Sequence, residues 1–198
     1  FLGALPTTGK DSGEEIQAMV DAFNELLDVA AGVTPTPTVT VEDLQALGIT
    51  GVNANNLAII LALIAATSDD GSQISSPAAL QALVTQSLLG ASLNVIRDYG
   101  ESVNNTVPTL SEYTNIGITT LSATQVSGFN TFVAPLAVAA TDSVVEVREL
   151  TNLYLSVLAT AAGQTGSPAI TETSIAKLGI TGVTADNLAA ILVAIAAT

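Results

Sequence analysis

Apolar residues recur with the period of a helix in the segment 54–66. Four of them fall at i, i+3, i+4 and i+7 and so share one helical face: Leu57, Ile60, Leu61 and Ile64. This segment and two later segments each follow a residue that often caps helices: Asn53, Ser122 and Thr184. The pattern predicts helices over 54–66, 123–140 and 185–197.

A shorter helix is predicted just before each of these segments. In the first case it covers 41–47, with Thr40 as its N-cap, and Gly48 follows at the position where a left-handed residue ends many helices. Ile49 then packs back against the helix. The same arrangement is expected around Gly117 and Gly179.

A longer helix follows the first two of these pairs, and one more opens the chain. Ser76 and Pro77 form a cap and first-turn pair for a helix that runs to Tyr99. Its counterparts are predicted at 12–31 and 143–162. We find no sustained alternation typical of strands, since the alternating stretch VTPTPTVT at 33–40 contains two prolines.

The chain repeats itself. Segments 40–67 and 171–198 are identical at 17 of 28 positions without a gap, and 109–141 keeps their pattern. The phrase LGITGV, at 47–52 and again at 178–183, joins the short helix to the next one. The predicted fold is therefore all-α: a tandem array of about three three-helix units, each a short helix, a GITG turn, a helix and a long helix.

The array is circularly permuted at its ends. Joined end to end, the chain would place its landmark glycines 69, 62 and 67 residues apart, as three complete repeats would. The predicted division is listed here: 1–39, the last part of a repeat; 40–108, repeat 1; 109–170, repeat 2; 171–198, the first two helices of repeat 3. The first and last segments are complementary, which indicates either excision from a longer array or head-to-tail packing between copies.

Composition removes several classes of function. With 18 acidic and 4 basic residues and a net charge of −14, the chain lacks the basic clusters that bind nucleic acid. The same charge keeps monomers apart at low salt. The longest apolar run has ten residues, about half of what a membrane span needs, so no span is expected. The N-terminus lacks the charged start of a signal peptide.

No enzymatic activity is predicted. The chain has no Cys and no His, so acid–base chemistry would fall to carboxylates, Lys or Tyr. Acidic groups gather at Asp11, Glu14 and Glu15 and at Asp69 and Asp70. Both groups stand near the start of a long helix, where carboxylates stabilise the helix dipole. We interpret them as caps, and we expect no organic cofactor.

Calcium is the one metal considered. Ser68, Asp69, Asp70 and Ser72 supply oxygen ligands around a Gly turn, as calcium prefers. The spacing of an EF-hand is missing, so a capped turn is the competing interpretation. The metal prediction rests on Asp69 and Asp70.

Two linkers have the composition of glycan carriers. The threonines of 33–40 resemble those of O-glycosylated stalks, and Asn104-Asn105-Thr106 fits an N-glycosylation site. A simple spacer is the alternative.

The middle copy differs from the other two. Phe129 and Phe132 replace aliphatic residues, and Pro135 interrupts the segment. The aromatic residues fit a repacked contact with the following long helix. A second interpretation is a contact surface, with Tyr113 beside them.

A resemblance adds to this picture. The stretch LGITGVTADNLAAILVAIAAT, with ALQALV at 79–84, resembles the helical repeats of giant bacterial surface and secreted proteins, many similar to type I-secreted adhesins. It implies an extracellular, acidic, Cys-free structural protein. Together with the complementary end segments, it leads us to expect a non-enzymatic protein of the bacterial cell surface or extracellular matrix that self-associates head to tail as a filament or serves as an extender segment of an adhesin. The alternative is a three-helix binding module that recognises a host or surface protein through Tyr113, Phe129 and Phe132.

Overall fold

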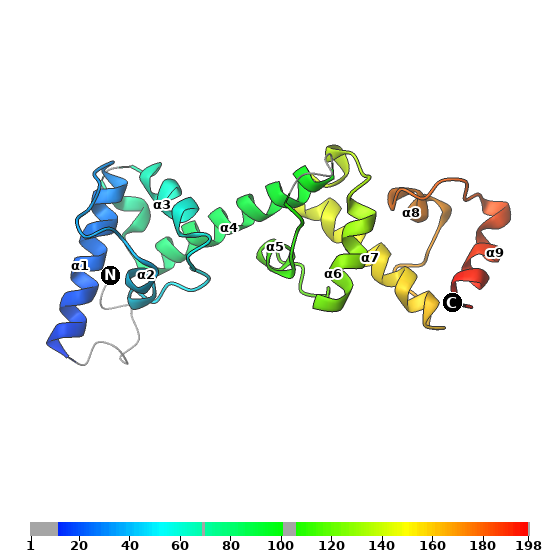
Figure 1. Ribbon diagram of the computed structural model, residues 1–198, viewed down its shortest axis with the longest axis horizontal. Coiled ribbons are helices and arrows are strands. Elements are labelled where there is room, and N and C mark those ends of the chain that lie inside the picture. The colour runs from blue at the N-terminus through cyan, green and yellow to red at the C-terminus, as the bar shows by residue number, and fades with distance from the viewer. Residues whose placement is uncertain (1–11, 69, 101–105, 198) are drawn as a thin grey trace. The chain divides into compact units, whose positions relative to one another are not determined.

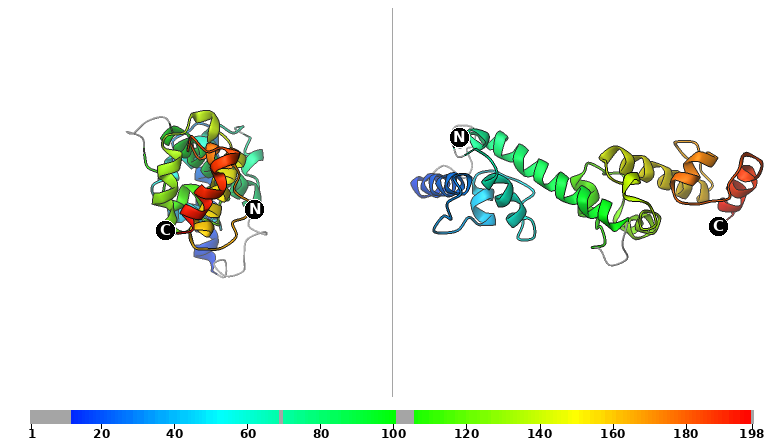
Figure 2. Two further views of the ribbon diagram at one scale, coloured as in Figure 1. Left: turned by 90° about the vertical axis from the view of Figure 1, so that its right-hand side faces the viewer. Right: turned by 90° about the horizontal axis from the view of Figure 1, so that it is seen from above.

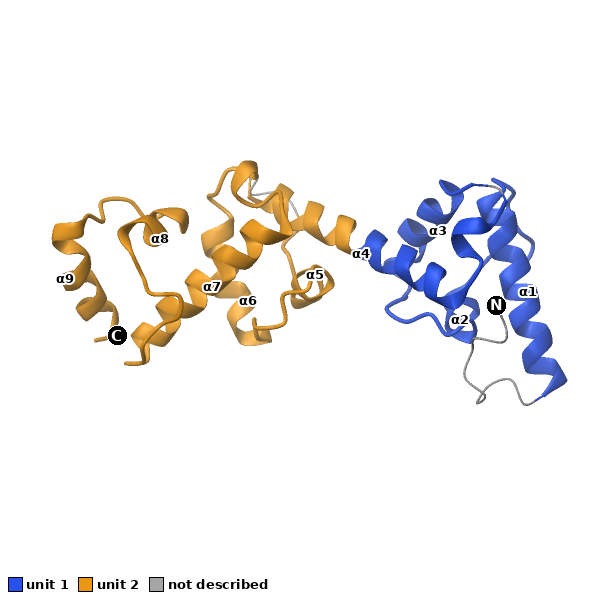
Figure 3. Ribbon diagram, turned by 180° about the vertical axis from the view of Figure 1, so that it is seen from behind, with its two compact units in different colours: residues 1–88 blue, residues 89–198 orange. Residues whose placement is uncertain are grey.

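The computed structural model describes residues 12–68, 70–100 and 106–197, and the regular elements in these ranges are all helical (Figure 1). The all-α prediction is confirmed. The chain divides into two compact units, residues 1–88 and 89–198, and the division falls inside one long helix (Figure 3). The α-helices within the described ranges are α1 Gly13–Ala30, α2 Val41–Ala46, α3 Leu57–Ala65, α4 Pro77–Tyr99, α5 Leu110–Asn115, α6 Ala123–Val133, α7 Val144–Ala161, α8 Glu172–Lys177 and α9 Ala185–Ile195.

The GIT turns end the short helices as the sequence predicts. Gly48 has φ 75°, its N–H donates to the Gln45 carbonyl, and the N–H of Ile49 donates to the Leu44 carbonyl at 3.0 Å. This pair of bonds is the Schellman motif, which satisfies the last carbonyls of α2. Gly117 and Gly179 adopt the same conformation after α5 and α8.

The predicted start of α3 is wrong. The side chain of Asn53 accepts hydrogen bonds from the N–H groups of Asn55 and Asn56, at 2.9 and 3.3 Å, and so closes a local turn. The helix begins only at Leu57, after Asn56. An Asn side chain can stabilise a turn as well as a helix start, and here the turn prevails.

The predicted end of α6 is also wrong. The helix ends at Val133 instead of running to residue 140, because Pro135 has no N–H and its ring obstructs the preceding turn. A separate 3₁₀ turn, Val138–Ala140, follows it.

The core of unit 1 lies where α1 packs against α2 and α3 (Figures 1 and 2). Leu26 of α1, Leu44 of α2 and Ile60 of α3 are at most 1% exposed. The first half of α4 completes this core with Leu80 and Val84, both fully buried. Four helices therefore share one apolar cluster.

The core of unit 2 combines the second half of α4 with α5, α6 and α7. Its fully buried members include Ile96 of α4, Tyr113 of α5, Phe129 of α6 and Val147 of α7. Farther along the chain, α7 contacts α8 and α9. Helix α4 thus packs in the core of unit 1 with its first half and in the core of unit 2 with its second half. The repeat boundaries stay a prediction.

Helix α4 is long and apolar enough to cross a membrane by length and composition, which the run of ten residues did not reveal. It is the one such helix among the described residues, and core helices of soluble proteins can have the same length and composition. Leu80, Val84 and Ile96 place α4 in the two apolar clusters.

Candidate functional site

The predicted calcium ligands fall only partly within the described residues. Asp69 lies outside them. Asp70 accepts a hydrogen bond from the N–H of Ser72 at 3.0 Å, which lowers the pKa of its carboxyl group. In the part of the chain that the structure describes, no three acidic side chains gather as a metal site requires. Calcium binding stays a prediction.

Among the acidic residues near the starts of the long helices, Glu15 caps α1 and Glu146 caps α7. Glu15 accepts a hydrogen bond from the N–H of Ser12 at 3.2 Å, and its own N–H donates to the Ser12 hydroxyl. Ser143 and Glu146 form the same reciprocal pair at α7. Asp11 lies outside the described residues.

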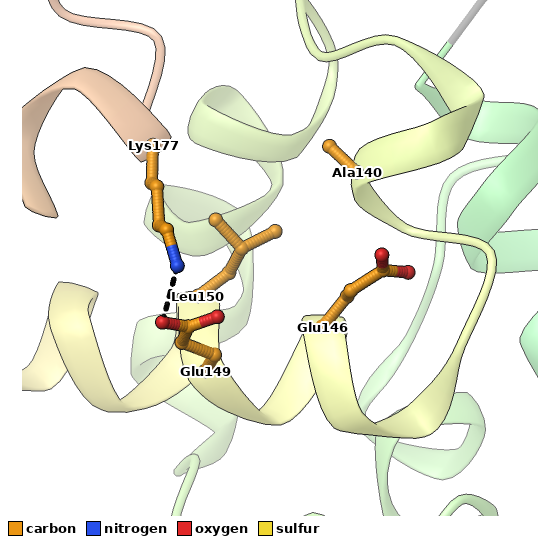
Figure 4. A pocket seen from close by; sticks show the side chains of 5 residues that line it. All are labelled: Ala140, Glu146, Glu149, Leu150 and Lys177. Atoms are coloured by element: carbon orange, nitrogen blue, oxygen red, sulfur yellow. Dashed lines mark hydrogen bonds and ion pairs between the residues drawn. The ribbon is translucent and has the colours of Figure 1, made fainter. Parts of the chain in front are cut away.

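A shallow pocket of about 200 Å³ lies between α7 and α8 (Figure 4). It is lined by Ala140, Glu146, Glu149, Leu150 and Lys177. The ammonium group of Lys177 forms an ion pair with Glu149 at 2.5 Å, and both side chains are about half exposed. The pair joins the two helices in solvent, where such contacts contribute little to stability.

Two carboxyl groups beside this pocket titrate differently. Hydrogen bonding from Ser143 lowers the pKa of the Glu146 carboxyl group. The hydrogen bond between Glu146 and Asp142, together with the negative charge of Glu146, raises the pKa of Asp142. Unequal carboxyl pairs can serve as acid and base. Here Glu146 already accepts the capping bonds of α7, so the pair has a structural explanation.

The aromatic residues of the middle copy belong to the core. Tyr113 and Phe129 are fully buried, with ring centroids 5.3 Å apart. Tyr154 of α7 contacts both Phe129 and Phe132. The predicted contact with the long helix is confirmed, and Tyr113 and Phe129 are not the surface patch that a binding module would need.

A buried polar network fixes Tyr113. Its hydroxyl donates to Asn130 Oδ1 at 2.6 Å, and Asn130 Nδ2 donates to the Pro108 carbonyl at 2.8 Å. Burial raises the pKa of Tyr113 far above its ordinary value. Asn130 also borders an open groove of about 480 Å³, which Tyr99, Thr109 and neighbouring residues line. Since both polar ends of Asn130 have partners within the protein, the network fastens α5 to α6.

The proposed glycan sites differ in how much the structure describes. Asn104 and Asn105 lie outside the described residues. In the linker 33–40 the threonines are exposed, while Pro35 and Val39 turn inward. Glycosylation stays a prediction.

Helices α8 and α9 expose apolar side chains whose equivalents in the other two helix pairs are buried. Ile49, which follows the first GIT glycine, is 2% exposed, and its counterpart Ile118 is also 2% exposed. The third counterpart, Ile180, is 40% exposed. Ile60 and Phe129 are almost fully buried, whereas Ile191 at the equivalent place is only partly buried. We call the surface around Ile180 and Ile191 the α8–α9 face.

A second apolar position is exposed at the start of α1. Ile16 is 41% exposed. Leu80 and Val147, which stand the same four residues after the cap serines of α4 and α7, are fully buried. Within the described ranges, the start of α1 therefore has no helix pair packed against it, and the pair α8 and α9 has no second long helix.

No family model, curated protein or solved structure matches the chain.

Proposed function

We propose that the chain is a non-enzymatic structural protein of the bacterial cell surface or extracellular matrix. Its units associate head to tail, either as a filament or as an extender segment of an adhesin. In this function the chain supplies reach and cohesion, and its principal interaction is helix packing between copies or neighbouring repeats.

One observation carries this proposal. Residues 47–52 and 178–183 are identical in sequence, yet Ile49 is buried and Ile180 is 40% exposed. Ile49 lies in a core completed by α4, and α8 and α9 have no following long helix in the described residues. A surface with the sequence of a core is suited to packing against a helix of the same kind.

Composition supports an extracellular setting. The chain has no Cys and a net charge of −14. Without Cys, the chain has no thiol that could be oxidised. The repulsion between its negatively charged copies weakens as salt screens the charge. Association of this acidic protein is therefore favoured at high ionic strength, as in sea water.

The burial of Tyr113 and Phe129 weighs against a host-binding surface at the place where the sequence suggested one. The structural function does not need such a surface.

Negative-stain electron microscopy with sedimentation velocity tests the proposal. Both are done on the full chain, from low to high NaCl, with and without calcium. Fibres or rods that lengthen with protein and salt concentration are expected. A chain that stays monomeric at every concentration would contradict the filament form of the proposal.

A further inference from the structure

Within unit 1, α4 covers α2 and α3 by a specific set of contacts. Leu80 and Val84 enter the same apolar cluster as Ile60. Beside them, the amide of Gln81 pairs with the backbone of Thr50, which belongs to the GIT turn. The N–H of Thr50 donates to Gln81 Oε1 at 2.8 Å, and Gln81 Nε2 donates to the Thr50 carbonyl at 3.2 Å.

The pairing gives the contact a register. A glutamine amide that both accepts from the N–H and donates to the carbonyl of one residue fits only when the helix is correctly placed along the turn. Apolar contacts alone would tolerate a shift of one helical turn. Gln81 therefore fixes where α4 lies on α2 and α3.

In unit 2, a different residue type stands at the position equivalent to Gln81. Val147 of α7 is fully buried in the cluster that contains Phe129, as Leu80 is beside Ile60. Arg148 replaces the glutamine, and its guanidinium lies close to Gly117 of the middle GIT turn. In both units the residue five places after the cap serine lies against the GIT turn.

Helix α1 carries the same residues in the same order. Counted from Ser12, its fourth, fifth and eighth residues are Ile16, Gln17 and Val20, and those counted from Ser76 are Leu80, Gln81 and Val84. Ile16 is 41% exposed and Val20 is partly exposed. Gln17 donates to Asp21 Oδ1 within α1, at 2.8 Å, and is exposed.

The α8–α9 face carries residues equivalent to those that α4 contacts in unit 1. Thr181 follows Ile180 as Thr50 follows Ile49, and Ile191 stands where Ile60 stands. Thr181 is exposed, and no glutamine amide pairs with it among the described residues. Both halves of the α4 contact are thus present a second time in the chain, and among the described residues neither half contacts a partner of this kind.

We infer that the first two turns of α1 from one copy dock on the α8–α9 face of a second copy in the register that α4 adopts on α2 and α3. Ile16 and Val20 pack against Ile191, and the amide of Gln17 pairs with the backbone of Thr181. This inference rests on the proposed head-to-tail association and specifies its occupant and its register.

The first test compares two changes from an exposed apolar residue to aspartate. Ile16→Asp places a charge in the docking surface, whereas Val145→Asp places one in the first turn of α7, where Val145 is 73% exposed. At high salt, Ile16→Asp is expected to weaken association by about 10-fold or more, as for the loss of a central apolar contact. Val145→Asp should change it by less than about 2-fold.

The second test locates the contact by cross-linking. The natural chain has no Cys, so Gln17→Cys in one preparation and Thr181→Cys in another can be mixed and joined by a short bismaleimide. A Thr50→Cys, Gln81→Cys double variant reports the yield for the internal pair. Gln17→Cys mixed with Val145→Cys serves as the negative control.

The outcomes separate the docking register from association itself. A Gln17→Cys to Thr181→Cys product that approaches the internal pair in yield, together with the loss caused by Ile16→Asp, supports the inference. Association that persists in Ile16→Asp without that product overturns the docking mode and leaves the proposed function standing. A monomer under all conditions overturns both the docking between copies and the filament form of the proposed function, and the α8–α9 face then has another occupant.

Discussion

The segment 40–67, which holds α2 and α3, and the segment 171–198, which holds α8 and α9, are identical at 17 of 28 positions but differ in burial. Ile49, Ile60 and their neighbours lie in a closed core, whereas Ile180 and Ile191 remain accessible. The turn geometry is the same, since Gly48 has φ 75° and Gly179 has φ 78°. Local sequence thus determines the helices and turns, and the covering long helix determines whether their apolar face is buried.

The largest expected effect is a difference in stability between two equivalent isoleucines. Ile60→Ala should lower the free energy of unfolding of unit 1 by about 2–5 kcal/mol, because a fully buried side chain leaves a cavity. Ile191→Ala should cost less than half as much in dilute solution, since Ile191 is already partly exposed.

Urea unfolding followed by circular dichroism measures both variants. Tyrosine fluorescence assigns the transition, because Tyr99, Tyr113 and Tyr154 all lie in residues 89–198. Equal losses for the two variants would show that the α8–α9 face is as well packed as α2 and α3.

The turn glycines should behave alike in the two regions. Gly48→Ala and Gly179→Ala each force a Cβ into a left-handed conformation, which costs about 1–2 kcal/mol. The cost comes from the backbone and does not depend on the covering helix. Thermal unfolding of both variants checks this, and a much smaller loss at Gly179 would mean that the third GIT turn is not formed.

Glu25 should give a pH-dependent effect confined to unit 1. Burial, and then the negative charges of Asp43, Asp21 and Asp28, raise its pKa above the ordinary 4.5. Its ionisation therefore opposes folding, so the stabilising contribution is full at low pH and is lost as the pH rises through the raised pKa.

Glu25→Gln should raise the melting temperature at pH 7, and the gain should shrink when the pH is lowered below 4.5. Glu42→Gln, which removes an exposed charge in the same unit, is the matched control. A gain that is equal for the two variants, or that does not change with pH, would refute the account of Glu25.

The smallest effect is expected at the ion pair between α7 and α8. Lys177→Gln should lower the free energy of unfolding by about 0.5 kcal/mol or less, because the pair is half exposed. The urea midpoint of unit 2 measures it. A loss of several kcal/mol would show that this contact, and not apolar packing, holds α8 to α7.

The sequence predicted best what depends on neighbours along the chain. The glycine turns at Gly48, Gly117 and Gly179 and the caps at Ser12 and Ser143 involve residues within one or two helical turns of each other. The start of α3 was harder to predict, because the Asn53 side chain can stabilise either a turn or a helix start. The difference in free energy between these two conformations is small.

The contact between α4 and the first GIT turn could be found only by comparing positions in space. Gln81 and Thr50 are 31 residues apart, and neither residue type is distinctive. A signal was nevertheless present, since Gln17 and Gln81 each stand five residues after a cap serine. It gained meaning only when the structure showed Gln81 paired with the GIT turn.

Hydrogen exchange of α9 compared with α3, at low and high protein concentration in high salt, tests the central claim most directly. The account predicts that amides of residues 185–195 exchange faster than those of 57–65 in dilute solution and become protected as the concentration rises. Residues 57–65 should not change. Exchange of α9 that is independent of concentration, or as slow as that of α3 in the monomer, would contradict the claim that this face is open and is covered by a second copy.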